Sequence, residues 1–267
     1  MHTMNRIKQR FQRLKARGES ALVGFVTAGD PDPQRSFQIV SAMARAGLDV
    51  LELGVPFSDP TADGPVIQRS STRALKSGMR MGQILDMTAR LRKETGIPII
   101  LFSYYNPILA YGSERFYEEA TGAGADGALV VDLPPEESTE LTAGWDPARF
   151  ALIRLVAPTT AKDRMRSIAG DAAGFLYMVS KTGVTGSAGL DTTAVGAQIA
   201  LLREVTTLPI CVGFGVSTPE DVAALSVKAD GVVIGSAFER LIEENIDSPD
   251  LPELLGEQTR TYKAATR

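Results

Sequence analysis

Two acidic residues in one short stretch are the first candidates for chemistry. The segment LELGVPFSDPTADGP, residues 51–65, places Glu52 between Leu51 and Leu53 in an apolar run that is typical of a buried strand. Asp63 follows in a loop punctuated by glycine and proline, and the segment contains no Lys or Arg. Burial of a carboxyl group without a basic partner raises its pKa into the range in which it both gives and takes a proton. We therefore interpret Glu52 as a catalytic acid or base.

The aspartates of this loop also have an ordinary structural explanation. Asp59 precedes Pro60, and Asp before Pro initiates turns, so we interpret Asp59 as a turn residue. Asp63 precedes Gly64, a pair that suits a turn as well as a functional carboxylate. From this loop alone, both interpretations of Asp63 stay open.

The composition excludes several other kinds of chemistry. The only histidine, His2, lies at a terminus where chains fray, so neither a His-based triad nor a His-based metal site is expected. The only cysteine, Cys211, cannot form an internal disulfide and suits a reducing cytoplasm. The basic start of the chain lacks the apolar region of a signal peptide. A formal net charge of -4 argues against nucleic acid as the main partner, and no apolar run is long enough to span a membrane.

The elements that must position these residues follow a regular alternation. Amphipathic segments with apolar residues at helical spacing, such as residues 34–47 and 193–205, separate short continuous apolar runs. This order predicts parallel βαβ units in a sheet that is covered on both faces. The predicted strands are residues 21–26, 49–53, 97–102, 126–131, 150–155, 174–179, 208–212 and 230–234.

Eight such units predict a (β/α)8 (TIM) barrel that forms one domain over residues 1–267. An open doubly wound sheet is the alternative, but the turn after the first strand lacks its glycine fingerprint. Apolar residues at helical spacing within residues 1–18 predict an extra N-terminal helix docked on the barrel. If Leu51 and Leu53 face the helices, Glu52 points into the barrel at the end where barrel enzymes have their active sites.

Glycine-rich loops follow the last three predicted strands. Gly213 and Gly215 follow the seventh, and Gly235 and Ser236 follow the eighth, where barrels commonly bind phosphate through backbone N–H groups and a helix N-terminus. Tight turns would explain one such loop, but the adjacent pair favours phosphate. The loop after the sixth strand, SKTGVTGSAGL, is a candidate lid. Its Lys181 allows a rival hypothesis of a Schiff-base aldolase, which its polar surroundings disfavour.

Several aromatic residues fall at or near the ends of the predicted strands. They are Phe25, Phe102, Tyr177 and Phe214. Packing in the barrel interior is the ordinary explanation for any one of them. Together they suit a flat, apolar ligand.

Six motifs, spread in order over all eight units, carry a family resemblance. LELGVPFSDPTADGP, YYNPILAYG, DLPPEES, SKTGVTGS, VGFGVSTPE and VIGSAFE resemble the alpha subunits of tryptophan synthase. The resemblance implies a (β/α)8 lyase that cleaves indole-3-glycerol phosphate into indole and glyceraldehyde 3-phosphate without a cofactor or metal of its own. It also implies an alpha2beta2 heterotetramer, in which the beta subunit carries pyridoxal phosphate and receives the indole. A stand-alone lyase that releases indole, or a catalytically silent activating partner, are the alternatives.

The resemblance also implies a role for each site residue. Glu52 would be the general acid and base, and Asp63 would accept the indole N–H and stay ionised. Tyr177 would position the substrate near Glu52. The indole slot would be lined by Phe25, Phe102, Leu129, Leu155 and Phe214, with Thr185 closing over it. The phosphate would be surrounded by Gly186, Gly213, Gly215, Gly235 and Ser236.

Overall fold

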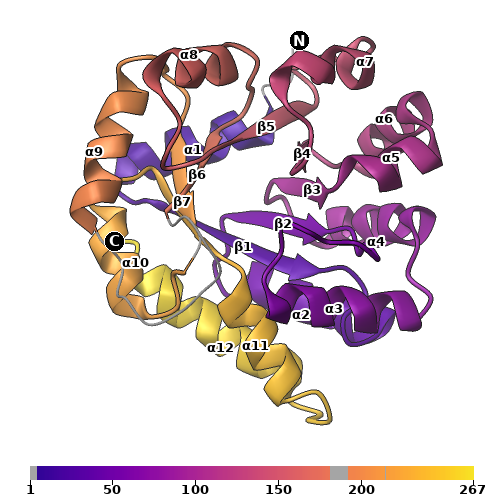
Figure 1. The fold of residues 1–267 in the computed structure, drawn as a ribbon. Coiled ribbons are helices and arrows are strands. Elements are labelled where there is room, and N and C mark those ends of the chain that lie inside the picture. The colour runs from indigo at the N-terminus through magenta and orange to yellow at the C-terminus, as the bar shows by residue number, and fades with distance from the viewer. Residues whose placement is uncertain (1–4, 181–191, 214) are drawn as a thin grey trace.

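Figure 1 shows the chain as a computed structural model, which describes residues 5–180, 192–213 and 215–267. Eight parallel strands form a closed barrel in chain order, and β1 completes the circle by pairing with β8. The predicted (β/α)8 class and all eight predicted strands are confirmed, and the open sheet is wrong. The strands are β1 (Ala21–Thr27), β2 (Val50–Gly54), β3 (Ile99–Ser103), β4 (Gly127–Val130), β5 (Ala151–Val156), β6 (Leu176–Val179), β7 (Ile210–Gly213) and β8 (Gly231–Ile234).

The helices surround the barrel and are more numerous than one for each strand (Figure 1). Two helices follow β2, two follow β3, and α12 packs against α2 beside the first unit. The bounds are α1 (Arg6–Arg17), α2 (Pro33–Arg45), α3 (Pro65–Lys76), α4 (Met81–Glu94), α5 (Tyr105–Tyr111), α6 (Ser113–Ala123), η1 (Pro135–Glu137), α7 (Ser138–Thr142), α8 (Lys162–Gly170), α9 (Thr192–Arg203), α10 (Pro219–Ser226), α11 (Ser236–Glu244) and α12 (Leu251–Ala264).

Side chains on the two faces of each strand form two separate apolar clusters. Leu51 and Leu53 belong to the outer cluster, between the strands and the helices. Val50 belongs to the inner cluster, inside the barrel, together with Leu129. Because successive side chains of a strand point to opposite faces, Glu52 lies on the same face as Val50. The leucines therefore fix the direction of Glu52, which points into the barrel.

The helix α1 covers the N-terminal end of the barrel. The Asn5 side chain accepts a hydrogen bond from the backbone N–H of Ile7 at 2.8 Å and so begins the helix. Ile7, Phe11 and Leu14 are all buried in the inner cluster, as their helical spacing predicted. The Phe11 and Phe175 rings lie 5.7 Å apart between centroids. Because α1 covers this end, we expect ligands to enter the barrel at the other end, where the strands finish.

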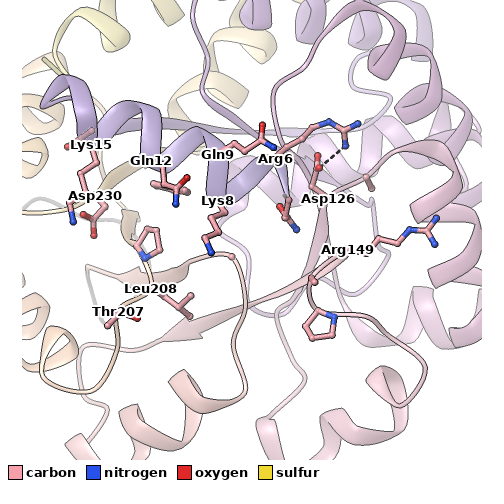
Figure 2. A pocket seen from close by; sticks show the side chains of 18 of the residues that line it. Arg6, Lys8, Gln9, Gln12, Lys15, Asp126, Arg149, Thr207, Leu208 and Asp230 are labelled. Atoms are coloured by element: carbon pink, nitrogen blue, oxygen red, sulfur yellow. Dashed lines mark hydrogen bonds and ion pairs between the residues drawn. The ribbon is translucent and has the colours of Figure 1, made fainter. Parts of the chain in front are cut away.

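A cavity of about 1380 Å³ lies at the N-terminal face, between α1 and loops that precede the strands, such as residues 146–149 and 207–209 (Figure 2). Its lining mixes cations such as Lys8 and Lys15 with acids such as Asp126 and Asp230. Arg6 already binds Asp126 at 2.9 Å, as the dashed line in Figure 2 marks. The cavity lies at the end of the barrel opposite to Glu52, so it is separate from the candidate site.

Candidate active site

Glu52 is a fully buried carboxylic acid at the centre of the candidate site. It lies in β2, level with Phe25 on β1 and with Ile100 on β3. Its side chain has no exposed surface, and neither carboxyl oxygen has a hydrogen-bond partner among the described residues. Burial raises the pKa of Glu52 to about 8. The group is therefore mostly protonated at neutral pH, close enough to its pKa to give a proton and to take one back.

Asp63 lies in the loop between β2 and α3, and its carboxylate has a defined partner. The Tyr104 hydroxyl donates a hydrogen bond to Asp63 Oδ2 at 3.0 Å and accepts one from the Ala62 backbone N–H at 3.0 Å. Burial raises the pKa of Asp63 to about 6, and the Tyr104 hydrogen bond opposes that rise. At neutral pH Asp63 is thus mostly ionised while Glu52 is mostly protonated. Two acids whose surroundings separate their pKa values suit different roles in one reaction.

Tyr104 is the partner that the sequence did not single out. It follows β3 directly and is almost fully buried, with its ring 5.2 Å from that of Phe57 between centroids. Burial, and next the charge of Asp63, raise the pKa of the Tyr104 hydroxyl, so it stays a hydrogen-bond donor. Its place in the YYNPILAYG motif immediately after a strand was the available signal, because strand ends form the site in a barrel.

The predicted aromatic slot forms inside the mouth of the barrel. The Phe25 and Phe102 rings meet edge to face, with centroids 5.1 Å apart and planes at 75°. Phe102 is level with Leu129 on β4, and Leu155 on β5 is level with Tyr177 on β6. Leu129 and Tyr177 belong to the inner cluster, and Phe102 and Leu155 pack against it. The structure thus brings these side chains together around Glu52.

Tyr177 lies over the end of β7. Burial, and next the charge of Glu52, raise the pKa of the Tyr177 hydroxyl well above its ordinary value. A Cβ atom on Gly213 would lie 2.2 Å from that hydroxyl, so the phenol occupies the space over this glycine. Gly213 therefore has to lack a side chain for Tyr177 to keep its place.

The predicted phosphate loops lie at the same end of the barrel. Gly235 precedes α11, Ser236 is the first residue of that helix, and no side chain caps it. A Cβ atom on Gly235 would lie 3.5 Å from Phe25, so this loop borders the aromatic slot. Gly215 has a φ of 76°, which glycine adopts without strain. The first backbone N–H groups of α11 thus have no side-chain cap, a feature that suits a helix N-terminus for binding an anion.

Some predictions fall on residues that the structure does not describe. These are Lys181, Thr185, Gly186 and Phe214. Asp59 is exposed, and its carbonyl oxygen accepts a hydrogen bond from the Thr61 backbone N–H at 2.9 Å, as expected of a turn residue. Within the described ranges, no group of three or more His, Cys, Asp or Glu side chains is placed to hold a metal ion.

The closed barrel holds a buried acid without a hydrogen-bond partner among the described residues, and a second acid of lower pKa. Glycine loops lie beside a helix N-terminus at the same end. These features are typical of (β/α)8 enzymes that use carboxylates to transfer protons on a phosphorylated substrate. The comparisons with known proteins make this class specific. A family model described as "Tryptophan synthase alpha chain" matches residues 11–266. The chain belongs to the tryptophan synthase alpha chain family.

Similar proteins agree over nearly the whole chain. The tryptophan synthase alpha chain of Desulfosudis oleivorans is 64% identical over 264 residues, which cover 99% of this chain and 100% of that protein. The corresponding chain of Desulfatibacillum aliphaticivorans is 62% identical with the same coverage. The crystal structure of tryptophan synthase subunit alpha from Legionella pneumophila superimposes with a TM-score of 0.90 at 38% identity, covering 99% of each chain. As a member of this family, the chain is a carbon–carbon lyase that cleaves indole-3-glycerol phosphate into indole and glyceraldehyde 3-phosphate.

Proposed function

We propose that Glu52 and Asp63 together carry out the cleavage. The protonated Glu52 gives its proton to the indole ring carbon that bears the glycerol chain. The ionised Asp63 accepts the indole N–H hydrogen bond and stabilises the positive charge that the ring acquires. The Glu52 carboxylate then takes the proton of the adjacent side-chain hydroxyl, and the carbon–carbon bond breaks. Its electron pair returns to the ring, which leaves indole, an aldehyde and a protonated Glu52.

The single observation that carries this proposal is the isolation of Glu52. A buried carboxyl group with no hydrogen-bond partner among the described residues destabilises the fold, and its pKa of about 8 suits a proton shuttle at neutral pH. Each well-placed acid or base contributes about 10²–10⁴ in rate. An imine-forming lysine is unnecessary, because the protonated indole ring itself accepts the electrons of the breaking bond.

Binding is proposed to follow the same division of the site. The rings of Phe25 and Phe102 offer apolar surface for the indole, and Tyr177 lies between this surface and Gly213. The backbone N–H groups at the start of α11 suit the phosphate dianion. Anchoring both ends of the substrate would hold the reacting carbon beside Glu52, which lowers the entropic part of the barrier.

The family name implies a beta partner. We propose an alpha2beta2 heterotetramer in which this partner carries the pyridoxal phosphate, while this chain binds no cofactor. Support comes from α5, whose Leu109 side chain is 51% exposed, on the strand-end face of the barrel where indole would leave. The buried thiol of Cys211 suits the cytoplasmic location that we also propose.

The test is indole release from indole-3-glycerol phosphate by the purified chain, with and without a beta subunit. Glu52→Gln keeps the shape of the side chain but cannot shuttle a proton, so we expect it to lose at least about 10²-fold in kcat while still binding the substrate. Asp63→Asn should lose a similar factor. Asp59→Asn, an exposed acid in the same loop, is the matched control and should keep wild-type activity. Wild-type rates for Glu52→Gln would refute the proposal.

A further inference from the structure

A second fully buried acid lies outside the groups that the cleavage uses. Glu239 is in the first turn of α11, three positions after Ser236, and its side chain has no exposed surface. Its Oε1 atom accepts a hydrogen bond from the backbone N–H of Thr27, at the end of β1, at 2.5 Å. Its Oε2 atom has no N–H or O–H donor among the described residues. A buried oxygen of this kind requires an explanation.

The group that faces Glu239 is the carboxyl group of Asp30, which is also buried. Both Asp30 oxygens accept hydrogen bonds from Arg73, from Nε at 2.7 Å and from Nη2 at 2.8 Å. Arg73 Nη1 donates to Glu243 at 2.8 Å, and Glu243 also binds Arg69. The two arginines are thus occupied by Asp30 and Glu243, and neither forms an ion pair with Glu239.

Two carboxyl groups that face each other in a buried place hold one proton between them, because both cannot ionise. Both oxygens of Asp30 are already bound by the Arg73 guanidinium. Burial, and next the charge of Asp30, raise the pKa of Glu239 well above its ordinary value. A proton on Glu239 would therefore lie on Oε2, the oxygen that has no donor among the described residues.

The cluster of Glu239, Asp30 and Arg73 connects the two helices that begin at the active site. Glu239 belongs to α11, which follows the phosphate loop, and Arg73 belongs to α3, which follows the Asp63 loop. Thr27 joins them a second time, because its hydroxyl lies 2.7 Å from the Ser70 hydroxyl of α3. Figure 1 shows α3 and α11 side by side, next to the end of β1.

We propose that Glu239 acts as a neutral carboxylic acid, a positioning residue that holds α11 against β1 and α3 and so fixes the phosphate site relative to Asp63. This inference rests on the function proposed above. An apolar residue here would leave the Thr27 N–H without an acceptor, whereas a neutral acid accepts from Thr27 with one oxygen and donates to Asp30 with the other.

The first experiment tests the proton. In Glu239→Gln the amide oxygen accepts from Thr27 and the amide NH₂ donates to Asp30, so the variant imitates the neutral acid. In wild type, rising pH favours the unfolded chain, in which Glu239 ionises freely. We therefore expect the unfolding free energy in urea of Glu239→Gln, relative to wild type, to increase from pH 5 to pH 8. A difference that stays constant with pH would overturn the proposal, whether or not the chain has lyase activity.

The second experiment tests positioning. Glu239→Ala should raise the KM for indole-3-glycerol phosphate about tenfold, the effect of one hydrogen bond left unmade, with kcat within about threefold, and Glu239→Gln should restore wild-type KM. If Glu239→Ala does not fold, Ser70→Ala is the alternative variant. It weakens the contact of Thr27 with α3 without leaving a buried charge unpaired, and it should raise KM by a smaller factor. Asp126→Asn, a buried acid at the opposite end of the barrel, is the matched control and should leave KM unchanged.

Unchanged KM in Glu239→Ala, or failure of Glu239→Gln to restore it, would overturn the positioning role. An inactive wild type would instead refute the proposed function, and the two failures are therefore distinguishable.

Discussion

The unfolding free energy of Glu52→Gln, relative to wild type, should increase as pH rises. The pKa of the Glu52 carboxyl group is about 8 in the folded chain and 4.5 when the group is solvated, as in the unfolded chain. Below pH 4.5 it is protonated in both states and has no effect on the balance. Between pH 4.5 and 8 the unfolded chain releases this proton and the folded chain does not, so the unfolding free energy falls as pH rises.

The size of this effect follows from the two pKa values. One pKa unit corresponds to about 1.4 kcal/mol, so the cost to the folded state reaches about 3 kcal/mol at pH 7 and about 5 kcal/mol above pH 8. Glu52→Gln removes this pH-dependent cost. The Gln amide is itself buried without partners, which adds a cost that does not vary with pH. The informative quantity is therefore the slope of the difference between the two proteins.

The assay is urea unfolding followed by circular dichroism at several pH values, with the unfolding free energy taken from the midpoint and slope. We expect the difference between Glu52→Gln and wild type to grow by about 3 kcal/mol between pH 5 and pH 8. Val50→Ala changes the same face of β2 without an ionisable group, so its difference from wild type should not vary with pH. A change below about 1 kcal/mol for Glu52→Gln would show that Glu52 is not held neutral by burial, and would refute the reasoning.

Two further predictions concern the neighbours of the acids. Tyr104→Phe removes the hydrogen bond that lowers the pKa of Asp63. The acid limb of the pH profile of kcat/KM, expected near pH 6, should therefore move to higher pH. The alkaline limb, which Glu52 sets near pH 8, should not move. An unmoved acid limb in a pH series of indole release would contradict the assigned role of Asp63. Gly213→Ala should raise the KM for the phosphorylated substrate at least about tenfold, because the added Cβ would lie 2.2 Å from the Tyr177 hydroxyl and displace it. Steady-state kinetics of Gly213→Ala with and without Tyr177→Phe check this explanation, since loss of the hydroxyl should recover part of the defect; equal KM values for all variants would exclude it.

The sequence predicts the barrel and the direction of Glu52 because both depend on short-range patterns. The alternation of Leu51, Glu52 and Leu53 places the acid on the inner face of any strand with two covered sides. Each βα unit repeats the same local pattern, so the strands could be found one at a time. Continuous apolar runs and glycine loops after strands are signals of the same kind, and they located Gly213 and Gly235 at the mouth of the barrel.

Contacts between distant segments could not be predicted in this way. Tyr104 meets Asp63 across 41 residues of sequence, and Glu239 meets Thr27 across 212. Glu239 lies in a helical segment of charged and apolar residues, where a glutamate ordinarily belongs on the exposed face. Only the closed barrel, in which β8 returns to β1, brings α11 against the first strand and buries it.

The helix α1 covers the N-terminal end of the barrel with its apolar face. Because this end is covered, we expect both the substrate and the product to pass through the strand-end face of the barrel. A protein bound to that face would therefore receive the product before it reaches the solvent. How long this protein stays bound would determine how much product is released into solution. The N-terminal face lies at the opposite end of the barrel, so a tag or fused domain placed there should interfere least with the passage of substrate and product.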